Sequence, residues 1–363
     1  MRIKLILSIV ICIVLFSCSD DKSVDPKPEP KNYEIPNSYN FENVDISDQL
    51  VRMQMLEEMK KLISDAIANK TAISAGALEG MYKNLGTPFF DPTLNNSPNN
   101  LYSQTDPSRT TFFEGYFKDM NNVSTTKIAG NNKKGILITK DGTQTFLVDS
   151  VGKEYMEVLE KGIMGALFYY QVAQVLTSND KIGDNVDNKT VIEGQGTAMQ
   201  HHWDEAYGYF GAPLSFPETT TDLRYTAKLC NDRNSVLNTN NLIMKEGFLK
   251  GRAAINNDDK QGKLDAVAKI KKYWELILVS SAVHHLKIAS TNFDDTAIKH
   301  HELTIAWMLL WSIQSNPDSN GLIYENAQAK IGTNYWNTVK SDVDEAIGIL
   351  VKGYKLEDVK DAL

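Results

Sequence analysis

The sequence predicts an all-α fold, a multi-helix bundle-like domain with one small β-hairpin. Apolar residues recur at three- and four-residue steps over most of the chain after residue 40, as on the buried faces of amphipathic helices. Residues 135–149 instead place two β-branched runs on either side of Asp141-Gly142, which is typical of a tight hairpin turn. Because 42% of the 363 residues are hydrophobic, the chain can bury a large core.

The periodicity predicts the helices in order. The first covers residues 47–66 with Ser47 as its N-cap, and the second covers residues 74–85, ending at Gly86-Thr87-Pro88. A loop rich in Asn, Ser and Pro follows to about residue 110. Residues 305–311 are all apolar, so we expect the helix that contains them at the centre of the bundle. The remaining helices are predicted at about residues 152–177, 195–210, 239–256, 263–289, 296–314 and 334–351.

The first residues predict an export signal that is not part of the fold. Arg2 and Lys4 precede an apolar run at residues 5–16, which is shorter than the roughly 20 residues of a membrane span. Leu15-Phe16-Ser17-Cys18 resembles a bacterial lipobox, in which the cysteine becomes the acylated N-terminus after cleavage. We therefore expect a lipoprotein signal peptide at residues 1–17 and lipidation of Cys18.

The segment behind Cys18 predicts a surface location and a tether. Ser19-Asp20-Asp21 resembles the acidic signal that sends Bacteroidetes lipoproteins to the outer face of the outer membrane. Residues 18–38 are proline-rich, which indicates a disordered tether, and we expect one helical domain at residues 39–363. The membrane is thus a predicted partner through the lipid on Cys18.

Charge and cysteine content exclude several classes of protein. The formal net charge is −8 and no basic patch is present, so nucleic acid is not an expected partner. Cys230 has no cysteine left to pair with after Cys12 is removed and Cys18 is lipidated, so stability must come from packing. The Glu-x-x-His pairs of di-iron bundles and the His-Glu-x-x-His of zincins are both absent.

The strongest candidate for a metal site lies in the helix at residues 195–210. His201 and His202 precede Glu205 by four and three residues, so one helical turn offers up to three ligands to a divalent metal. The alternative is a structural hydrogen-bonded pair of imidazole and carboxylate. The apolar stripe of the same helix is expected in the core: Met199, Trp203, Ala206, Tyr207 and Phe210.

Two further histidine pairs lie in later helices. His285 falls on an apolar stripe, with His284 at its margin, and is expected to be buried, neutral and hydrogen-bonded. His301, next to His300 and one turn before Ile305, invites the same interpretation. The alternative is that one histidine from each of three helices converges with Glu205 inside the bundle.

Several of these segments together resemble a known family. HHWDEAYGYFGAP at 201–213, Arg233-Asn234, FLKGRAAI at 248–255 and Ala306-Trp307 behind a His-His-Glu are similar to the DUF4856 family of Bacteroidetes lipoproteins. The resemblance implies an exported, mostly helical protein of undefined function. A weaker similarity, through His202-x-x-Glu205, is to imelysin-like lipoproteins of iron uptake, marked by Gly-x-His-x-x-Glu; Gln200 stands in the glycine position.

These observations predict an outer-membrane, surface-exposed binding component of nutrient uptake, for iron or haem, that works with outer-membrane uptake partners. We expect a binding protein rather than an enzyme, with a divalent metal as the candidate cofactor. Two alternatives stay open. One is an extracellular hydrolase with Glu205 as acid or base; the other is a glycan-binding surface lipoprotein in which Trp336, Tyr335 or Tyr324 lines an open groove.

Overall fold

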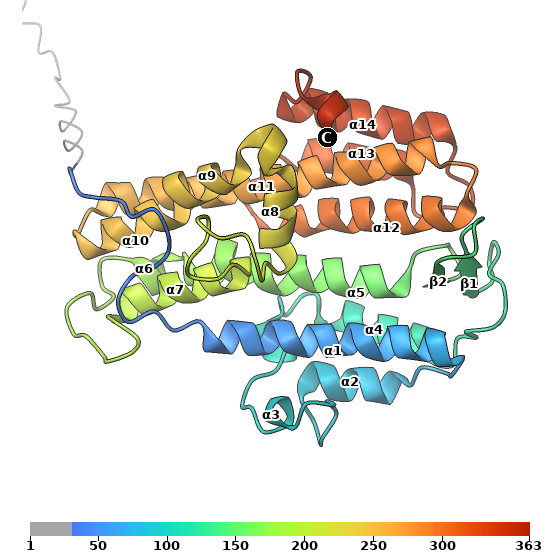
Figure 1. The fold of residues 1–363 in the computed structure, drawn as a ribbon, viewed down its shortest axis with the longest axis horizontal. Coiled ribbons are helices and arrows are strands. Elements are labelled where there is room, and N and C mark those ends of the chain that lie inside the picture. The colour runs from blue at the N-terminus through green and yellow to red at the C-terminus, as the bar shows by residue number, and fades with distance from the viewer. Residues whose placement is uncertain (1–30) are drawn as a thin grey trace, which may run out of the picture. The chain divides into compact units, whose positions relative to one another are not determined.

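The computed structural model describes residues 31–363, and helices carry nearly all of the regular structure in this part of the chain (Figure 1). The predicted signal peptide, Cys18 and most of the predicted tether lie outside the described residues. A compact unit begins at Tyr33, inside the predicted tether, where the Tyr33 hydroxyl donates a hydrogen bond of 2.9 Å to Asp259. The fold is all-α with one β-hairpin, as the sequence predicted.

The elements follow in chain order. The first half contains α1 (Ser47–Asn69), α2 (Ala75–Lys83), α3 (Pro92–Asn95), α4 (Thr110–Met120), strands β1 (Gly135–Ile138) and β2 (Thr145–Val148), α5 (Tyr155–Ile163) and α6 (Asn179–Ile182). The second half contains α7 (Ala198–Phe210), α8 (Tyr225–Leu237), α9 (Thr239–Ile243), α10 (Leu249–Asn256), α11 (Lys260–Thr291), α12 (Thr296–Ser312), α13 (Gly321–Ile331) and α14 (Lys340–Tyr354).

Helix α5 lies between α1 on one side and α12 on the other (Figure 1). Helix α12 also packs on α11 and α13, so its predicted central place is confirmed, although Trp307 and Trp311 are only half-buried. The hairpin packs at the end where α5 begins, against both α5 and α12. Among the residues that the structure describes, no helix combines the length and apolar character needed to cross a bilayer.

The start of α1 differs from the prediction in one detail. Ser47 is the first helical residue and not the N-cap, a position that Ile46 holds without a side-chain hydrogen bond. The Asp45 carboxylate accepts instead from the Ser47 backbone N–H at 3.0 Å. Ser74, the first residue of the second predicted helix, is the N-cap of α2, and the predicted hairpin is present, pairing Gly135 with Val148 through Ile138 with Thr145.

Two predicted helices are interrupted by wider turns. The segment predicted at 152–177 is α-helical only in α5 and continues as π-helical turns at Met164–Tyr169 and Gln171–Leu176. The segment predicted at 239–256 is split into α9 and α10 by a π-helical turn at Met244–Phe248. Gly165 lies so close to Ser312 of α12 that a side chain there would overlap it, so this glycine allows the close approach of the turn at Met164–Tyr169 to α12.

The last predicted helix begins later than expected, and five of the described α-helices were not predicted. Helix α14 starts at Lys340 rather than at residue 334, because the preceding turn packs on the loop before α5: the Tyr335 N–H donates to the Val151 carbonyl at 2.9 Å and the Tyr335 ring is fully buried. The α-helices missing from the prediction are the short α3 and α6, and α4, α8 and α13.

Candidate metal centre

A tight turn between β2 and α5 positions the first residue of the site. The Asp149 carboxylate accepts from the N–H groups of Val151 and Lys153 at 2.9 and 2.8 Å. Gly152 adopts φ 89°, and a side chain there would overlap the His300 ring, so only glycine suits this position. Glu154 therefore stands directly before α5, where its own N–H donates to the Thr304 hydroxyl at 3.0 Å.

The first turns of α12 position the second part of the site. Asp295 caps this helix by accepting from the N–H groups of Ala297 and Ile298 at 3.0 and 3.2 Å. Its other carboxylate oxygen accepts from the N–H of Lys140 in the hairpin turn at 2.7 Å. The hairpin is thereby fixed on α12, and the Phe146 ring of β2 stacks on the His301 ring with centroids 4.4 Å apart.

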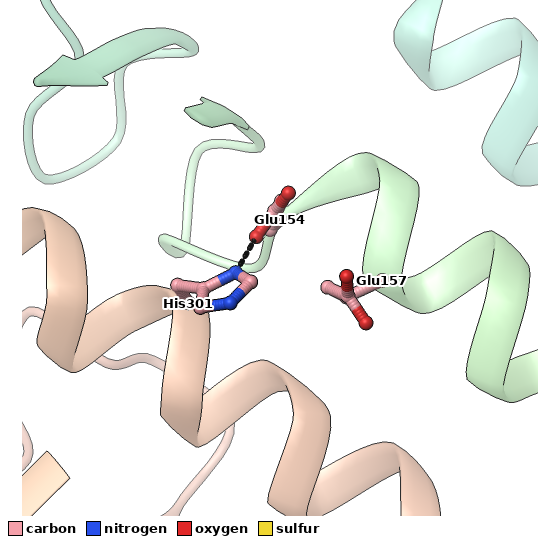
Figure 2. Close-up of side chains that lie close together, drawn as sticks. All are labelled: Glu154, Glu157 and His301. Atoms are coloured by element: carbon pink, nitrogen blue, oxygen red, sulfur yellow. Dashed lines mark hydrogen bonds and ion pairs between the residues drawn. The ribbon is translucent and has the colours of Figure 1, made fainter. Parts of the chain in front are cut away.

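Glu154, Glu157 and His301 come together between α5 and α12, and we call these three residues the α5–α12 cluster (Figure 2). The His301 Nδ1–H donates to Glu154 Oε2 at 2.5 Å. One ligand atom from each of the three residues lies within 4.8 Å of the other two. Within residues 31–363, no other group of three or more His, Cys, Asp or Glu has this geometry. Two carboxylates and one imidazole are ligands that suit divalent transition metals.

Burial and pairing shift the pKa values of Glu154 and His301 strongly. Burial raises the pKa of the Glu154 carboxyl to about 7, against the opposing hydrogen bond and charge of His301. Burial alone would lower the pKa of His301, but the hydrogen bond and charge of Glu154 outweigh it and raise that pKa to about 9. The raised pKa of His301 keeps a proton on the imidazole at neutral pH, and a bound cation would have to displace it.

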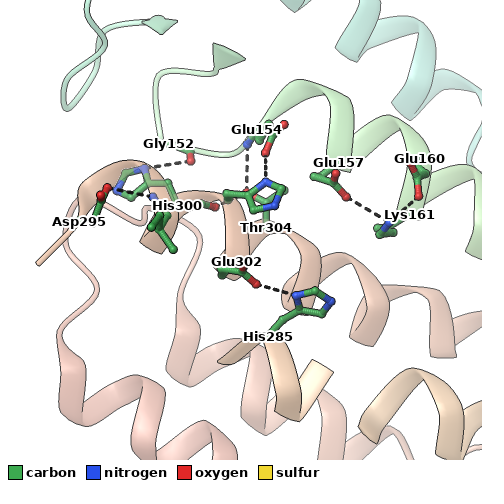
Figure 3. A network of polar contacts seen from close by, with 12 residues as sticks. Gly152, Glu154, Glu157, Glu160, Lys161, His285, Asp295, His300, Glu302 and Thr304 are labelled. Atoms are coloured by element: carbon green, nitrogen blue, oxygen red, sulfur yellow. Dashed lines mark hydrogen bonds and ion pairs between the residues drawn. The ribbon is translucent and has the colours of Figure 1, made fainter. Parts of the chain in front are cut away.

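Glu157 is the least satisfied member of the cluster. Its carboxylate is 7% exposed, and its Oε2 has no hydrogen-bond partner. The Lys161 ammonium, one turn further along α5, lies 3.3 Å from that oxygen and 2.5 Å from Glu160 (Figure 3). Glu160 also pairs with Lys60 of α1, and the two lysines outweigh its burial and lower its pKa to about 2. Among the described contacts, Glu157 Oε2 has this long ion pair with Lys161 but no hydrogen bond, so it is available to a second cation.

A second pair of imidazole and carboxylate lies beside the cluster. His285 of α11 donates from Nδ1 to the Glu302 carboxylate of α12 at 2.6 Å (Figure 3). His300 is fully buried, whereas the side chains of His285 and His301 are 19% and 21% exposed. His285 and His301 are therefore hydrogen-bonded, as expected, but only partly buried, and the expected neutral state is wrong for His301, because Glu154 raises its pKa to about 9.

The structure places the residues predicted from α7 away from this cluster. His202 donates from Nδ1 to the Lys181 carbonyl at 2.8 Å, and its Nε2 lies 3.4 Å from the Lys181 ammonium. Glu205 accepts from Gln49 of α1 at 3.2 Å, and His201 has a buried Nδ1 without a hydrogen-bond partner. Glu205 does not meet His285 or His301, so the three-helix convergence with Glu205 is not formed; metal binding on α7 stays a prediction.

The aromatic residues named for a sugar-binding groove are mostly enclosed. Tyr335 and Tyr324 are 0% and 5% exposed, so their ring faces are covered by protein. Trp336 is half-buried and lies edge-on to His300 with ring centroids 4.4 Å apart. The apolar stripe predicted on α7 is in the core, as expected, and the Trp203 indole donates to the Phe248 carbonyl at 3.0 Å.

Sequence reasoning singled out His301 but missed Glu154 and Glu157. The sequence signal that could have found them is the Glu-x-x-Glu formed by Glu154 and Glu157 at the start of a strongly apolar segment. Carboxylates buried in such a segment need partners. The distance along the chain hid the partner: Glu154 and His301 are 147 residues apart.

Comparison with known sequences identifies the family of the chain. A family profile described as a domain of unknown function, DUF4856, matches residues 36–329, which is most of the chain. The chain belongs to the DUF4856 family. The α5–α12 cluster lies inside the matched range. No curated protein and no solved structure matches the chain.

Proposed function

We propose that this protein is an outer-membrane, surface-exposed lipoprotein that binds a divalent metal ion at the α5–α12 cluster, as the binding component of an iron-uptake system. The observation that carries the proposal is the cluster itself. Two helices bring two carboxylates and an imidazole within 4.8 Å, and one buried carboxylate oxygen has no hydrogen-bond partner. Metal sites in helical bundles are built in this way, from side chains on facing helices.

The ligand set defines the class of metal. Carboxylates and a neutral imidazole favour Fe²⁺, Mn²⁺ and Zn²⁺, whereas Cu⁺ prefers thiolate and thioether ligands. Three ligand atoms this close suit a single ion, so the proposal favours the ion over haem as the nutrient. The lipobox at Cys18 and the following Ser19-Asp20-Asp21 support the membrane location.

Calorimetric titration with Fe²⁺, Mn²⁺ and Zn²⁺ tests the metal site. The wild type should bind one ion per chain, and His301→Ala should weaken binding at least about 100-fold. The matched control is His285→Ala, which removes the neighbouring imidazole paired with Glu302 and should leave binding unchanged. Equal isotherms for the wild type and His301→Ala would reject the site.

Two cellular measurements test the rest of the proposal. Cys18→Ala should block acylation and release the protein from the membrane fraction; palmitate labelling that persists in the variant would contradict lipidation at Cys18. A strain that lacks the protein should take up less iron under iron limitation, and the gene for the His301→Ala protein should fail to restore uptake although the protein is made and exported.

A further inference from the structure

We propose that Lys161 sets the metal affinity of the α5–α12 cluster, because its ammonium competes with the metal ion for the Glu157 carboxylate. This inference rests on the proposed function and adds to it a built-in competitor. Lys161 is thus a positioning residue of the site and not a metal ligand, since it can donate only hydrogen bonds and positive charge.

The geometry places one ammonium between two carboxylates. Lys161 Nζ lies 2.5 Å from Glu160 Oε1 and 3.3 Å from Glu157 Oε2, so Glu160 is its closer partner and Glu157 its weaker one. Glu157 and Lys161 are one helical turn apart on α5, which keeps the two side chains on the same face. The contact with Glu157 is therefore the one that a metal ion would replace.

Glu160 can hold Lys161 in an ion pair when a metal ion binds Glu157. Glu160 is buried and pairs with Lys60 of α1 as well as with Lys161, whereas Lys60 has no contact with Glu157 among the described ion pairs. When a metal ion binds Glu157, Lys161 can keep its ion pair with Glu160, so no charged side chain has to leave the buried interface. Metal binding is then opposed by the repulsion between the Lys161 ammonium and a divalent ion bound to Glu157. This repulsion is only weakly screened because the site is buried.

Lys161→Met tests the competition, because methionine keeps the unbranched side chain and removes the charge. It should tighten Zn²⁺ and Mn²⁺ binding at least about tenfold, since one charge within roughly 4–6 Å shifts ionic equilibria by about one to three powers of ten. The matched control is Lys60→Met, which also removes one cation from Glu160 but none from Glu157, and should change affinity by less than about threefold.

A second variant protects the test against misfolding. Lys161→Met leaves Glu157 and Glu160 with one lysine fewer, whereas Lys161→Met with Glu160→Gln removes both members of one ion pair and keeps the buried charge balanced. Circular dichroism and thermal melting establish that each protein is folded before titration. The double variant should show the same tightening as Lys161→Met.

The outcomes separate the inference from the function on which it rests. Tighter binding in both Lys161 variants but not in Lys60→Met supports the inference. Wild-type binding with folded Lys161 variants that bind no more tightly overturns the inference alone, as does equal tightening in Lys60→Met. Binding only in the Lys161 variants supports the competition and overturns the proposed function of the wild type. Absence of binding in every protein overturns both.

Discussion

The same dipeptide, His-His, has different surroundings in α7 and in α12. In α7, His201 and His202 are half-buried, and His202 hydrogen-bonds to Lys181 of the neighbouring helix α6. In α12, His300 is fully buried against Gly152, and His301 donates to a carboxylate that is 147 residues away in the chain. The α7 pair has the spacing of a metal site within one helix, but the three-residue cluster forms at the α12 pair.

The difference teaches that helical spacing alone does not decide where ligands gather. His202 and Glu205 share a face of α7, yet each has a separate partner, Lys181 and Gln49. Glu154 and His301 share no local pattern, but α5 and α12 pack side by side and bring them to 2.5 Å. A buried carboxylate requires a partner, so the interface between helices selects the pair.

The largest loss of stability should come from the core face of α7 rather than from the face that carries its histidines. Trp203 is fully buried, donates to the Phe248 carbonyl and fills the space above Gly251. Trp203→Ala should therefore lower the free energy of unfolding by about 3–5 kcal/mol, measured by urea denaturation. A melting temperature unchanged within about one degree would show that α7 contributes little to the core.

The next largest effect separates the two histidine pairs as metal sites. His301→Ala should reduce metal affinity about 100-fold, or about 2.7 kcal/mol, because it removes the one imidazole of the α5–α12 cluster. His202→Ala and Glu205→Gln should leave the isotherm unchanged. The reverse result, with binding lost in His202→Ala and kept in His301→Ala, would move the site to α7.

A pH dependence should distinguish the buried His300 from the half-buried histidines. Burial, with the nearby charge of Lys299, lowers the pKa of His300 to about 3, although the Gly152 carbonyl opposes this. In the unfolded chain His300 takes up a proton near pH 6.5, whereas in the folded protein it stays neutral until about pH 3. Stability is therefore lost as the pH falls from about 6.5 toward 3.

The expected loss from His300 is about 2 kcal/mol between pH 7 and pH 5. Urea denaturation at both pH values should show this loss in the wild type and a smaller one in His300→Gln. Glutamine keeps a hydrogen-bonding side chain that does not titrate, and the wild type and the variant have all other titratable groups in common. An equal loss in both proteins would mean that the buried ring is not the source.

The smallest effect should come from the flank of α7. His202→Ala removes one hydrogen bond to the Lys181 carbonyl, and Glu205→Gln weakens one to Gln49, so each should cost about 1 kcal/mol of stability. Thermal denaturation of both variants beside Trp203→Ala provides the comparison. A loss as large as that of Trp203→Ala would show that the flank carries core packing.

The fold was predictable where the signal is local. The three- and four-residue spacing of apolar residues in α1, the Asp141-Gly142 turn and the apolar stripe of α7 each predicted an element that the structure contains. The prediction failed where a distant contact decides: α14 begins late because Tyr335 packs on the turn before α5.

The sequence by itself determined the helical class, the hairpin, the core face of α7 and the membership of the family, because these depend on residues a few positions apart or on motifs read in order. Only the tertiary structure decided which carboxylates meet which histidine. Helix periodicity states that a side chain is turned inward but not which helix faces it. The packing of α5 on α12 supplies that missing contact, and with it the α5–α12 cluster.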